Sequence, residues 1–259
     1  MVLAPEQHAF WRRNGYLWIE GLLTSAETAR LAAWTDELAG WSDTPGRWMR
    51  YYEKTADGGK TPARLENFLP FHAGLDRLFR GRFDALAGEL LGEPVVFFKD
   101  KINLKSPGGA GFTPHQDAPA YADFGVPFHA TVMVPIDRFT PGNGCLEMAR
   151  DAAQTTVLPQ NPDGTLRPEE EARFQWTPIL AGPGDVIVFD SYVPHRSGPN
   201  RSAGPRRSYY VTYNRAADGD HRQAYYDRKR ALFPQECERQ PGVDYAALGA
   251  QFNLANPFE

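Results

Sequence analysis

The amino-terminal part of the chain has the apolar spacing of helices, with one strand between them. Residues 5–14 predict a short helix, and residues 15–19 then predict a strand. A longer helix is predicted over 24–41, because a Thr-x-x-Glu capping box opens it and an apolar stripe follows. Residues 72–91 indicate a second long helical stretch.

Beyond Pro94 the pattern changes to short apolar runs separated by turns rich in glycine and proline. The runs cover 95–98, 101–105, 129–136, 175–179, 185–190 and 208–213. Many short strands at fairly regular spacing are typical of a β-sandwich or barrel, so we expect a mainly β protein with flanking helices. The polar insertion 159–173 predicts an exposed loop.

Neither a repeat nor a Ser/Gly-rich linker divides the chain, so we predict one domain over 1–259. Helices within 1–93 are expected to pack on a β core formed by 94–215, with 216–259 as a carboxy-terminal segment. The 22 prolines and 24 glycines suit a fold with many turns.

Composition narrows the function. Hydrophobic residues make up 42% and charged residues 23%, which is ordinary for a globular protein. The net charge of −4 gives no overall attraction to nucleic acid or anionic lipid. The two cysteines lie far apart, and neither a signal peptide nor a run of about 20 apolar residues is visible. We therefore expect a cytoplasmic protein, a monomer or homodimer, that acts on a small molecule.

The first candidate for chemistry is the segment Thr113-Pro114-His115-Gln116-Asp117. On an extended segment, His115 and Asp117 point to the same side, because side chains alternate with a period of two. Two histidines and one carboxylate on one face of a metal are typical of non-haem iron(II) oxygenases, which keep open positions for substrate and oxygen. A His-x-Asp pair alone is weak, since a surface hydrogen-bonded pair has the same pattern.

A second segment supplies the missing parts. His195 follows the apolar run 185–190, and a tight turn then leads to Arg206 at the start of another strand. A buried guanidinium needs a carboxylate partner, and its planar fork suits a bidentate one such as a bound dicarboxylate. A structural ion pair from Arg206 to Asp190 or Glu147 is the alternative, with neighbouring Arg207 as the rival ligand.

In this order, His115-Gln116-Asp117, His195 and Arg206 resemble the phytanoyl-CoA dioxygenase family of iron(II)/2-oxoglutarate oxygenases. The opening 10–16, the segment 143–147 and Gly184-Asp185 belong to the same resemblance, which runs over nearly the whole chain. It implies a double-stranded β-helix, the jelly roll of cupin-like proteins. It also implies Fe(II), 2-oxoglutarate as co-substrate and O2, with release of succinate and CO2 as a substrate is hydroxylated.

The resemblance assigns roles to individual positions. His115, Asp117 and His195 match the iron ligands and catalytic residues, and Arg206 matches the arginine that pairs with the distal carboxylate of 2-oxoglutarate. The remaining co-substrate positions are Ser197, Asn103 and Phe112, the last two by similarity to ectoine hydroxylases. The positions expected to face the substrate are Lys101, Gln116, Tyr121 and Tyr210. Bacterial members that act on small polar substrates, such as aminophosphonate hydroxylases, are the most similar branch.

One departure from the family stands out, and two other functions remain open. Many relatives have a Gly-Ser-His turn where this chain has residues 148–153, a difference we take as structural. Because Asp117 is present, hydroxylation is favoured over the halogenation of relatives that lack this carboxylate. A metal-dependent cupin that does not use 2-oxoglutarate would have no need of Arg206, and a metal-free jelly-roll binding protein would have lost a ligand.

Overall fold

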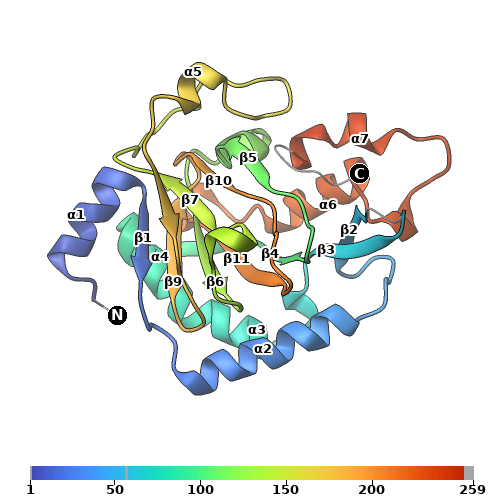
Figure 1. The fold of residues 1–259 in the computed structure, drawn as a ribbon, viewed down its shortest axis with the longest axis horizontal. Helices are drawn as coiled ribbons and strands as arrows, with labels where there is room; N and C mark the ends of the chain where they lie inside the picture. The colour runs from blue at the N-terminus through green and yellow to red at the C-terminus, as the bar shows by residue number, and fades with distance from the viewer. Residues whose placement is uncertain (1, 56–57, 254–259) are drawn as a thin grey trace.

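The fold is a jelly roll of two antiparallel sheets, as the resemblance implies. The computed structural model describes residues 2–55 and 58–253. A seven-stranded sheet has the order β1-β9-β6-β11-β4-β3-β2, and a four-stranded sheet has the order β5-β10-β7-β8. Figure 1 shows the smaller sheet facing the centre of the larger one.

The large sheet is built from seven strands: β1 (Tyr16–Ile19), β2 (Met49–Lys54), β3 (Lys60–Glu66), β4 (Val95–Lys105), β6 (His129–Pro135), β9 (Val186–Asp190) and β11 (Arg206–Arg215). The small sheet contains four strands: β5 (Phe112–His115), β7 (Leu146–Ala149), β8 (Trp176–Ile179) and β10 (His195–Ser197). The helices are α1 (Pro5–Asn14), α2 (Ser25–Gly40), α3 (Ala73–Leu78), α4 (Asp84–Leu91), α5 (Pro168–Glu171), α6 (Arg222–Leu232) and α7 (Tyr245–Leu248).

The outer face of the large sheet is apolar and is covered by helices. Side chains of β6, β9 and β11 such as Val132, Val188 and Val211 are fully buried and share one core with residues of α2, α3 and α4. In Figure 1 these three helices lie together on one side of the sheet. The predicted capping box is confirmed, since Glu27 N–H donates to Thr24 Oγ1 and Thr24 N–H donates to Glu27 Oε2.

The inner face of the large sheet is polar along its middle strands. The β4 side chains that point into the roll are Lys99, Lys101, Asn103 and Lys105. On the neighbouring strand β11 they are paired, in the same order, with Thr212, Tyr210, Ser208 and Arg206. The strand β3 extends two of these rows with Arg64 beside Asn103 and Glu66 beside Lys101. Because residues two apart share a face, one strand presents three lysines to the interior.

One expectation about the first 93 residues is corrected. Besides the helices and the predicted strand β1, they supply β2 and β3 of the large sheet. The helical stretch predicted over 72–91 is confirmed as α3 and α4, joined by a π-helical segment, Phe79–Phe83, whose two aromatic rings are fully buried. Residues 95–98 and 101–105 form one strand rather than two.

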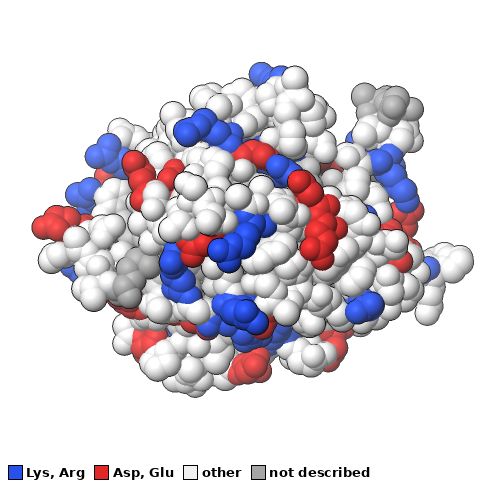
Figure 2. All heavy atoms as spheres, turned by 90° about the horizontal axis from the view of Figure 1, so that it is seen from below, with Lys and Arg blue, Asp and Glu red and all other residues white. Residues whose placement is uncertain are grey.

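The surface carries both signs of charge. On the face seen in Figure 2, basic and acidic side chains are intermixed over the helices. Within residues 2–55 and 58–253, none of the helices combines the length and the apolar character needed to cross a bilayer.

Candidate active site

His115, Asp117 and His195 meet between the two sheets. One ligand atom from each of the three side chains lies within 4.8 Å of the others. The strands β5 and β10 pair so that His195 lies directly opposite His115, and their ring centroids are 4.3 Å apart. Asp117 follows β5, and its Oδ1 lies 3.9 Å from His115 Nε2. The predicted convergence of these side chains is therefore present.

Both imidazoles are held with one nitrogen available. His115 Nδ1 lies 2.7 Å from the carbonyl oxygen of Thr113, and His195 Nδ1 lies 3.1 Å from that of Val193. Because a carbonyl only accepts, Nδ1 must carry the hydrogen in each ring. The lone pair is then on Nε2, which is the arrangement typical of metal-bound histidine.

The ionisation states suit a divalent metal. Burial, followed by the neighbouring His195, lowers the pKa of His115 to about 3, and burial also lowers the pKa of His195. Burial opposes ionisation of Asp117, but His195, Lys101 and Lys99 outweigh it and hold its pKa well below the usual range. The cluster is thus two neutral imidazoles and one carboxylate near neutral pH, so a metal ion has no proton to displace.

The two adjacent arginines at the start of β11 have different surroundings. Arg207 forms two hydrogen bonds of 2.9 Å with the carboxylate of Asp137 and one of 2.6 Å with Asp36. Arg206 is 1% exposed, and its Nε and Nη1 have no hydrogen-bond partner among the described residues. A buried guanidinium without an acceptor is costly, so this geometry indicates an anionic ligand for Arg206.

The structural alternatives for Arg206 have other partners. Glu147 accepts a hydrogen bond of 2.8 Å from Arg196 Nε. Asp190 accepts the N–H groups of Tyr192 and Val193 at 2.8 and 2.7 Å. Neither carboxylate pairs with Arg206.

A lysine that the sequence analysis did not select lies beside Arg206. Lys105 is in register with Arg206 on the neighbouring strand, and its Nζ donates to Ser197 Oγ at 2.9 Å and to the carbonyl of Gly198 at 2.7 Å. Burial, followed by the charge of Arg206, lowers the pKa of Lys105 to about 6. A carboxylate bound between Arg206, Lys105 and Ser197 would relieve the repulsion between the two basic groups.

A pocket extends from the three ligand side chains across the inner face of the large sheet. Of the residues predicted to bind co-substrate or substrate, its walls include Lys101, Asn103, Phe112, Gln116, Ser197 and Tyr210. Arg206 lies just beyond this lining, in register with Lys105 behind Ser197. These residues are gathered as predicted, and their individual roles stay predictions.

Two predicted substrate residues have surroundings that bear on their roles. The amide of Gln116 is already engaged, since Nε2 donates to the carbonyls of Tyr192 and Thr156 while Oε1 accepts Leu158 N–H at 2.7 Å. Tyr121 is 1% exposed and is not part of the pocket wall. Its ring lies under Lys99, with Nζ 4.4 Å from the ring centroid.

The wall residues that the sequence analysis did not select include Lys99, Arg64, Glu66, Lys229 and Tyr225. Lys99 could have been found, because the residues Lys-x-Lys-x-Asn-x-Lys over 99–105 share one face of a strand. The others come from β3 and α6, whose approach to β4 has no signal in the local pattern.

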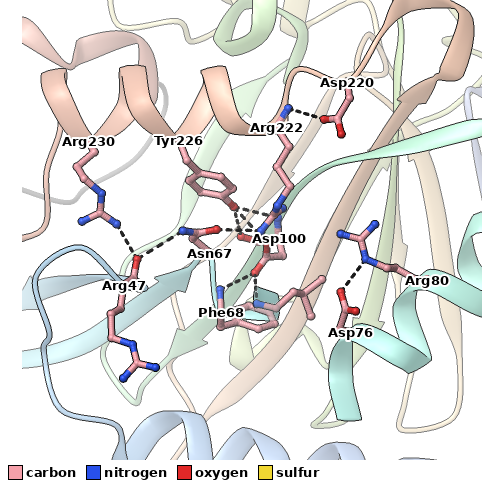
Figure 3. A network of polar contacts seen from close by, with 11 residues as sticks. Arg47, Asn67, Phe68, Asp76, Arg80, Asp100, Asp220, Arg222, Tyr226 and Arg230 are labelled. Carbon is pink, nitrogen blue, oxygen red and sulfur yellow. Dashed lines mark hydrogen bonds and ion pairs between the residues drawn. The ribbon is translucent and has the colours of Figure 1, made fainter. Parts of the chain in front are cut away.

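A buried network on the opposite side of β4 fixes this strand, as Figure 3 shows. Asp100 is fully buried and accepts Phe68 N–H at 2.7 Å and Arg222 Nη2 at 2.5 Å. The hydroxyl of Tyr226 accepts Asp100 N–H at 3.0 Å and donates to its carbonyl at 2.9 Å. Because Asp100 stands between Lys99 and Lys101 in the chain, these bonds also fix where the two lysines point.

A jelly roll that brings two histidines and an aspartate together beside an unsatisfied arginine defines an iron(II)- and 2-oxoglutarate-dependent dioxygenase. The model of the family described as phytanoyl-CoA dioxygenase (PhyH) matches residues 11–208. The chain belongs to this family, as the sequence predicted.

Individual relatives agree with this class. The chain is 43% identical to a 2-aminoethylphosphonate dioxygenase of Uncultured bacterium HF130_AEPn_1, over 98% of each chain. It is 41% identical to a methylphosphonate hydroxylase of Gimesia maris, over 90% of this chain and 89% of the relative. Among solved structures, EctD from S. alaskensis with 2-oxoglutarate and 5-hydroxyectoine has a TM-score of 0.74 at 22% identity and covers 83% of this chain and 77% of its own.

Proposed function

We propose that the protein hydroxylates a small phosphonate, with His115, Asp117 and His195 as the iron ligands. The observation that carries the proposal is a metal cluster of this type opening onto a pocket with several basic side chains, in a chain more than 40% identical to two enzymes named for phosphonates. A phosphonate carries close to two negative charges near neutral pH, like a phosphate monoester, so a basic pocket suits it.

The described residues fit both iron(II) and 2-oxoglutarate. Three donors on one side of a metal leave positions for the two-point chelation that a keto acid offers. The unpartnered Nε and Nη1 of Arg206 suit the far carboxylate of the same molecule, with Ser197 and Lys105 beside it. A cupin that does not use 2-oxoglutarate would leave this arginine without a role.

Iron(II) with 2-oxoglutarate supplies the oxidising chemistry, in which the keto acid is converted to succinate and CO2 while the substrate gains a hydroxyl group. The protein supplies position. Main-chain carbonyls orient His115 and His195, and Arg206 anchors the co-substrate at its far end. Leu146, Phe112 and Tyr210 form apolar parts of the wall, which limit the water that reaches the reacting carbon.

Succinate release in the presence of iron(II), oxygen and 2-oxoglutarate tests this proposal. The panel is 2-aminoethylphosphonate, methylphosphonate, a betaine and a free amino acid. Succinate release should depend on a phosphonate and should occur with a hydroxylated phosphonate as product. His115→Ala should abolish this turnover while the far-ultraviolet circular dichroism stays unchanged. Turnover retained in His115→Ala, or stimulated only by the betaine or amino acid, would contradict the proposal.

A further inference from the structure

The inner faces of β4 and its neighbour β11 carry two separate groups of basic side chains, one in the pocket wall and one just beyond its lining. At one end, Lys105 and Arg206 flank Ser197. At the other end lie Lys99 and Lys101, four and more residues away along the strand, which is roughly 13 Å or more at about 3.3 Å per residue. The first group is accounted for by the co-substrate, whereas the second is not.

Lys99 and Lys101 differ from Lys229 and Arg64 because, within the part of the chain that the structure describes, neither ammonium group has a hydrogen-bonded partner. Lys99 is 6% exposed, and neither its Nζ nor that of Lys101 makes a hydrogen bond to a described residue. Each ammonium group instead lies over an aromatic ring, Lys99 at 4.4 Å from the Tyr121 centroid and Lys101 at 4.7 Å from that of Tyr210. A cation–π contact stabilises a cation without satisfying its N–H donors.

Two other basic side chains in the wall, Arg64 and Lys229, differ from Lys99 and Lys101 because both contact the carboxylate of Glu66. Its Oε1 accepts Lys229 Nζ at 2.6 Å and lies 3.5 Å from Arg64 Nη1. Four basic side chains, Arg64, Lys99, Lys101 and Lys229, therefore share this pocket wall with one carboxylate, Glu66, besides the metal-cluster residue Asp117. The contacts with Lys229 and Arg64 are both made by Oε1 of Glu66, and none of the hydrogen bonds that this carboxylate makes with described residues involves Lys99 or Lys101.

We infer that Lys99 and Lys101 together form the subsite for the phosphonate of the substrate, recognised as a doubly charged tetrahedral oxyanion. This inference rests on the proposed function. Two ammonium groups offer six N–H donors in adjustable directions, which suits three oxygens around phosphorus better than a planar carboxylate. A dianion also suits a wall in which basic side chains outnumber carboxylates.

The position of the two lysines next to the metal cluster fits this role. Both line the same pocket as His115, Asp117 and His195. A phosphonate held there would have the carbon bonded to phosphorus in the same pocket as the three side chains that would hold the iron. Burial lowers the pKa of Lys99 to about 7 and that of Lys101 to about 8, so an arriving dianion also strengthens protonation of the groups that bind it.

The test uses full-length protein loaded with iron(II) and 2-oxoglutarate. Lys99→Met and Lys101→Met keep the length of the side chain and remove its charge. Each should raise the KM for 2-aminoethylphosphonate by about 10-fold or more, as expected for loss of a charged hydrogen bond, while the visible charge-transfer band of the iron–2-oxoglutarate complex persists. Lys105→Met is the matched comparison on the same strand face, and it should raise the KM for 2-oxoglutarate instead.

Thermal melting shows whether the variants fold, and removal of an unpaired buried charge should leave the midpoint equal or higher. If wild-type protein turns over no phosphonate, the proposed function fails. If wild-type protein turns over 2-aminoethylphosphonate and both Met variants at 99 and 101 keep its KM within twofold, the function stands and the lysine subsite is wrong. A wild-type kcat/KM for 3-aminopropionate, the carboxylate analogue, equal to that for the phosphonate would also overturn it.

Discussion

Replacement of Arg206 by methionine should weaken 2-oxoglutarate binding and at the same time stabilise the protein without ligand. The two effects have opposite signs because the guanidinium is buried, and its Nε and Nη1 find no acceptor among residues 2–55 and 58–253 until a carboxylate binds. A purely structural arginine would give only a loss of stability.

The magnitudes follow from the surroundings of Arg206. Truncation of one partner of a buried charged pair costs about 2–5 kcal/mol, which corresponds to a rise of roughly 30-fold to several thousand-fold in the Kd for 2-oxoglutarate. In the ligand-free protein, an unsatisfied buried donor costs about 1–3 kcal/mol. The contact with Phe139, whose ring centroid is 4.9 Å from the guanidinium carbon, offsets part of this cost. We expect a net gain of about 1 kcal/mol, or about 2–4 °C in Tm.

The assay is anaerobic titration of iron-loaded protein with 2-oxoglutarate, followed through the visible charge-transfer band, with thermal melts at each concentration. Arg207→Met is the control in the adjacent residue. It removes the ion pairs with Asp137 and Asp36, which are partly exposed, so Tm should fall slightly while the Kd for 2-oxoglutarate stays at the wild-type value. A wild-type Kd in Arg206→Met, or a loss of affinity in Arg207→Met alone, would refute the assignment.

Two further predictions concern stability. Burial, followed by the charge of Lys99, lowers the pKa of His129 to about 3. Below about pH 6.5 the unfolded chain therefore binds a proton at this histidine that the folded protein does not bind until about pH 3. The free energy of unfolding should therefore decrease as the pH is lowered from about 6.5 to about 3. His129→Phe should flatten that slope by up to about 1.4 kcal/mol per pH unit in urea titrations of metal-free protein, and an unchanged slope would contradict the reasoning. Asp100→Asn leaves Arg222 buried without its carboxylate and should lower the free energy of unfolding by about 3–5 kcal/mol, seen as a Tm lower by about 6 °C or more. A Tm within 2 °C of wild type would show that the network in Figure 3 contributes little to stability.

Local signals in the sequence were sufficient for most elements. The helices α1 and α2 begin and end within one residue of the prediction, because a capping box and a regular apolar stripe depend only on nearby residues. The strands β6, β8 and β9 were likewise visible as apolar runs bounded by turns. The jelly roll itself came from the family resemblance, since pairing between distant strands leaves no local trace.

The strands β2 and β3 were missed for a physical reason. The inner face of β3 carries Arg64 and Glu66, and charged residues at alternate positions usually indicate a solvent-exposed face. Both side chains are nevertheless buried, at 5% and 1% exposure, because they face a polar pocket and an ion pair with Lys229. Only the arrangement of the whole sheet reveals an interior in which charge is tolerated.

For the candidate site too, the local sequence pattern predicted some features, whereas others depend on contacts between distant parts of the chain. Period-two alternation alone placed His115 and Asp117 on one side, but their meeting with His195 depends on the pairing of β5 with β10. Alternation also separated Arg206 from Arg207 without telling which of them faces inward. That choice is made by Asp137 and Asp36, which hold Arg207 on the outside and lie about 70 and 171 residues away in sequence.

The register of β4 is the feature on which both anion sites depend. A shift of one residue would replace the inward row Lys99, Lys101, Asn103 and Lys105 with Asp100, Ile102, Leu104 and Ser106, and would remove the lysines of both proposed anion sites at once. Near Lys99 the pairing with β11 contains a bulge, so register there is not fixed by the ladder alone. The hydroxyl of Tyr226 bonds both main-chain groups of Asp100 just where β3 has ended, and thereby replaces the missing ladder bonds. Substitutions at Tyr226, which lies outside the pocket lining, should therefore weaken the proposed phosphonate binding through β4 rather than by direct contact.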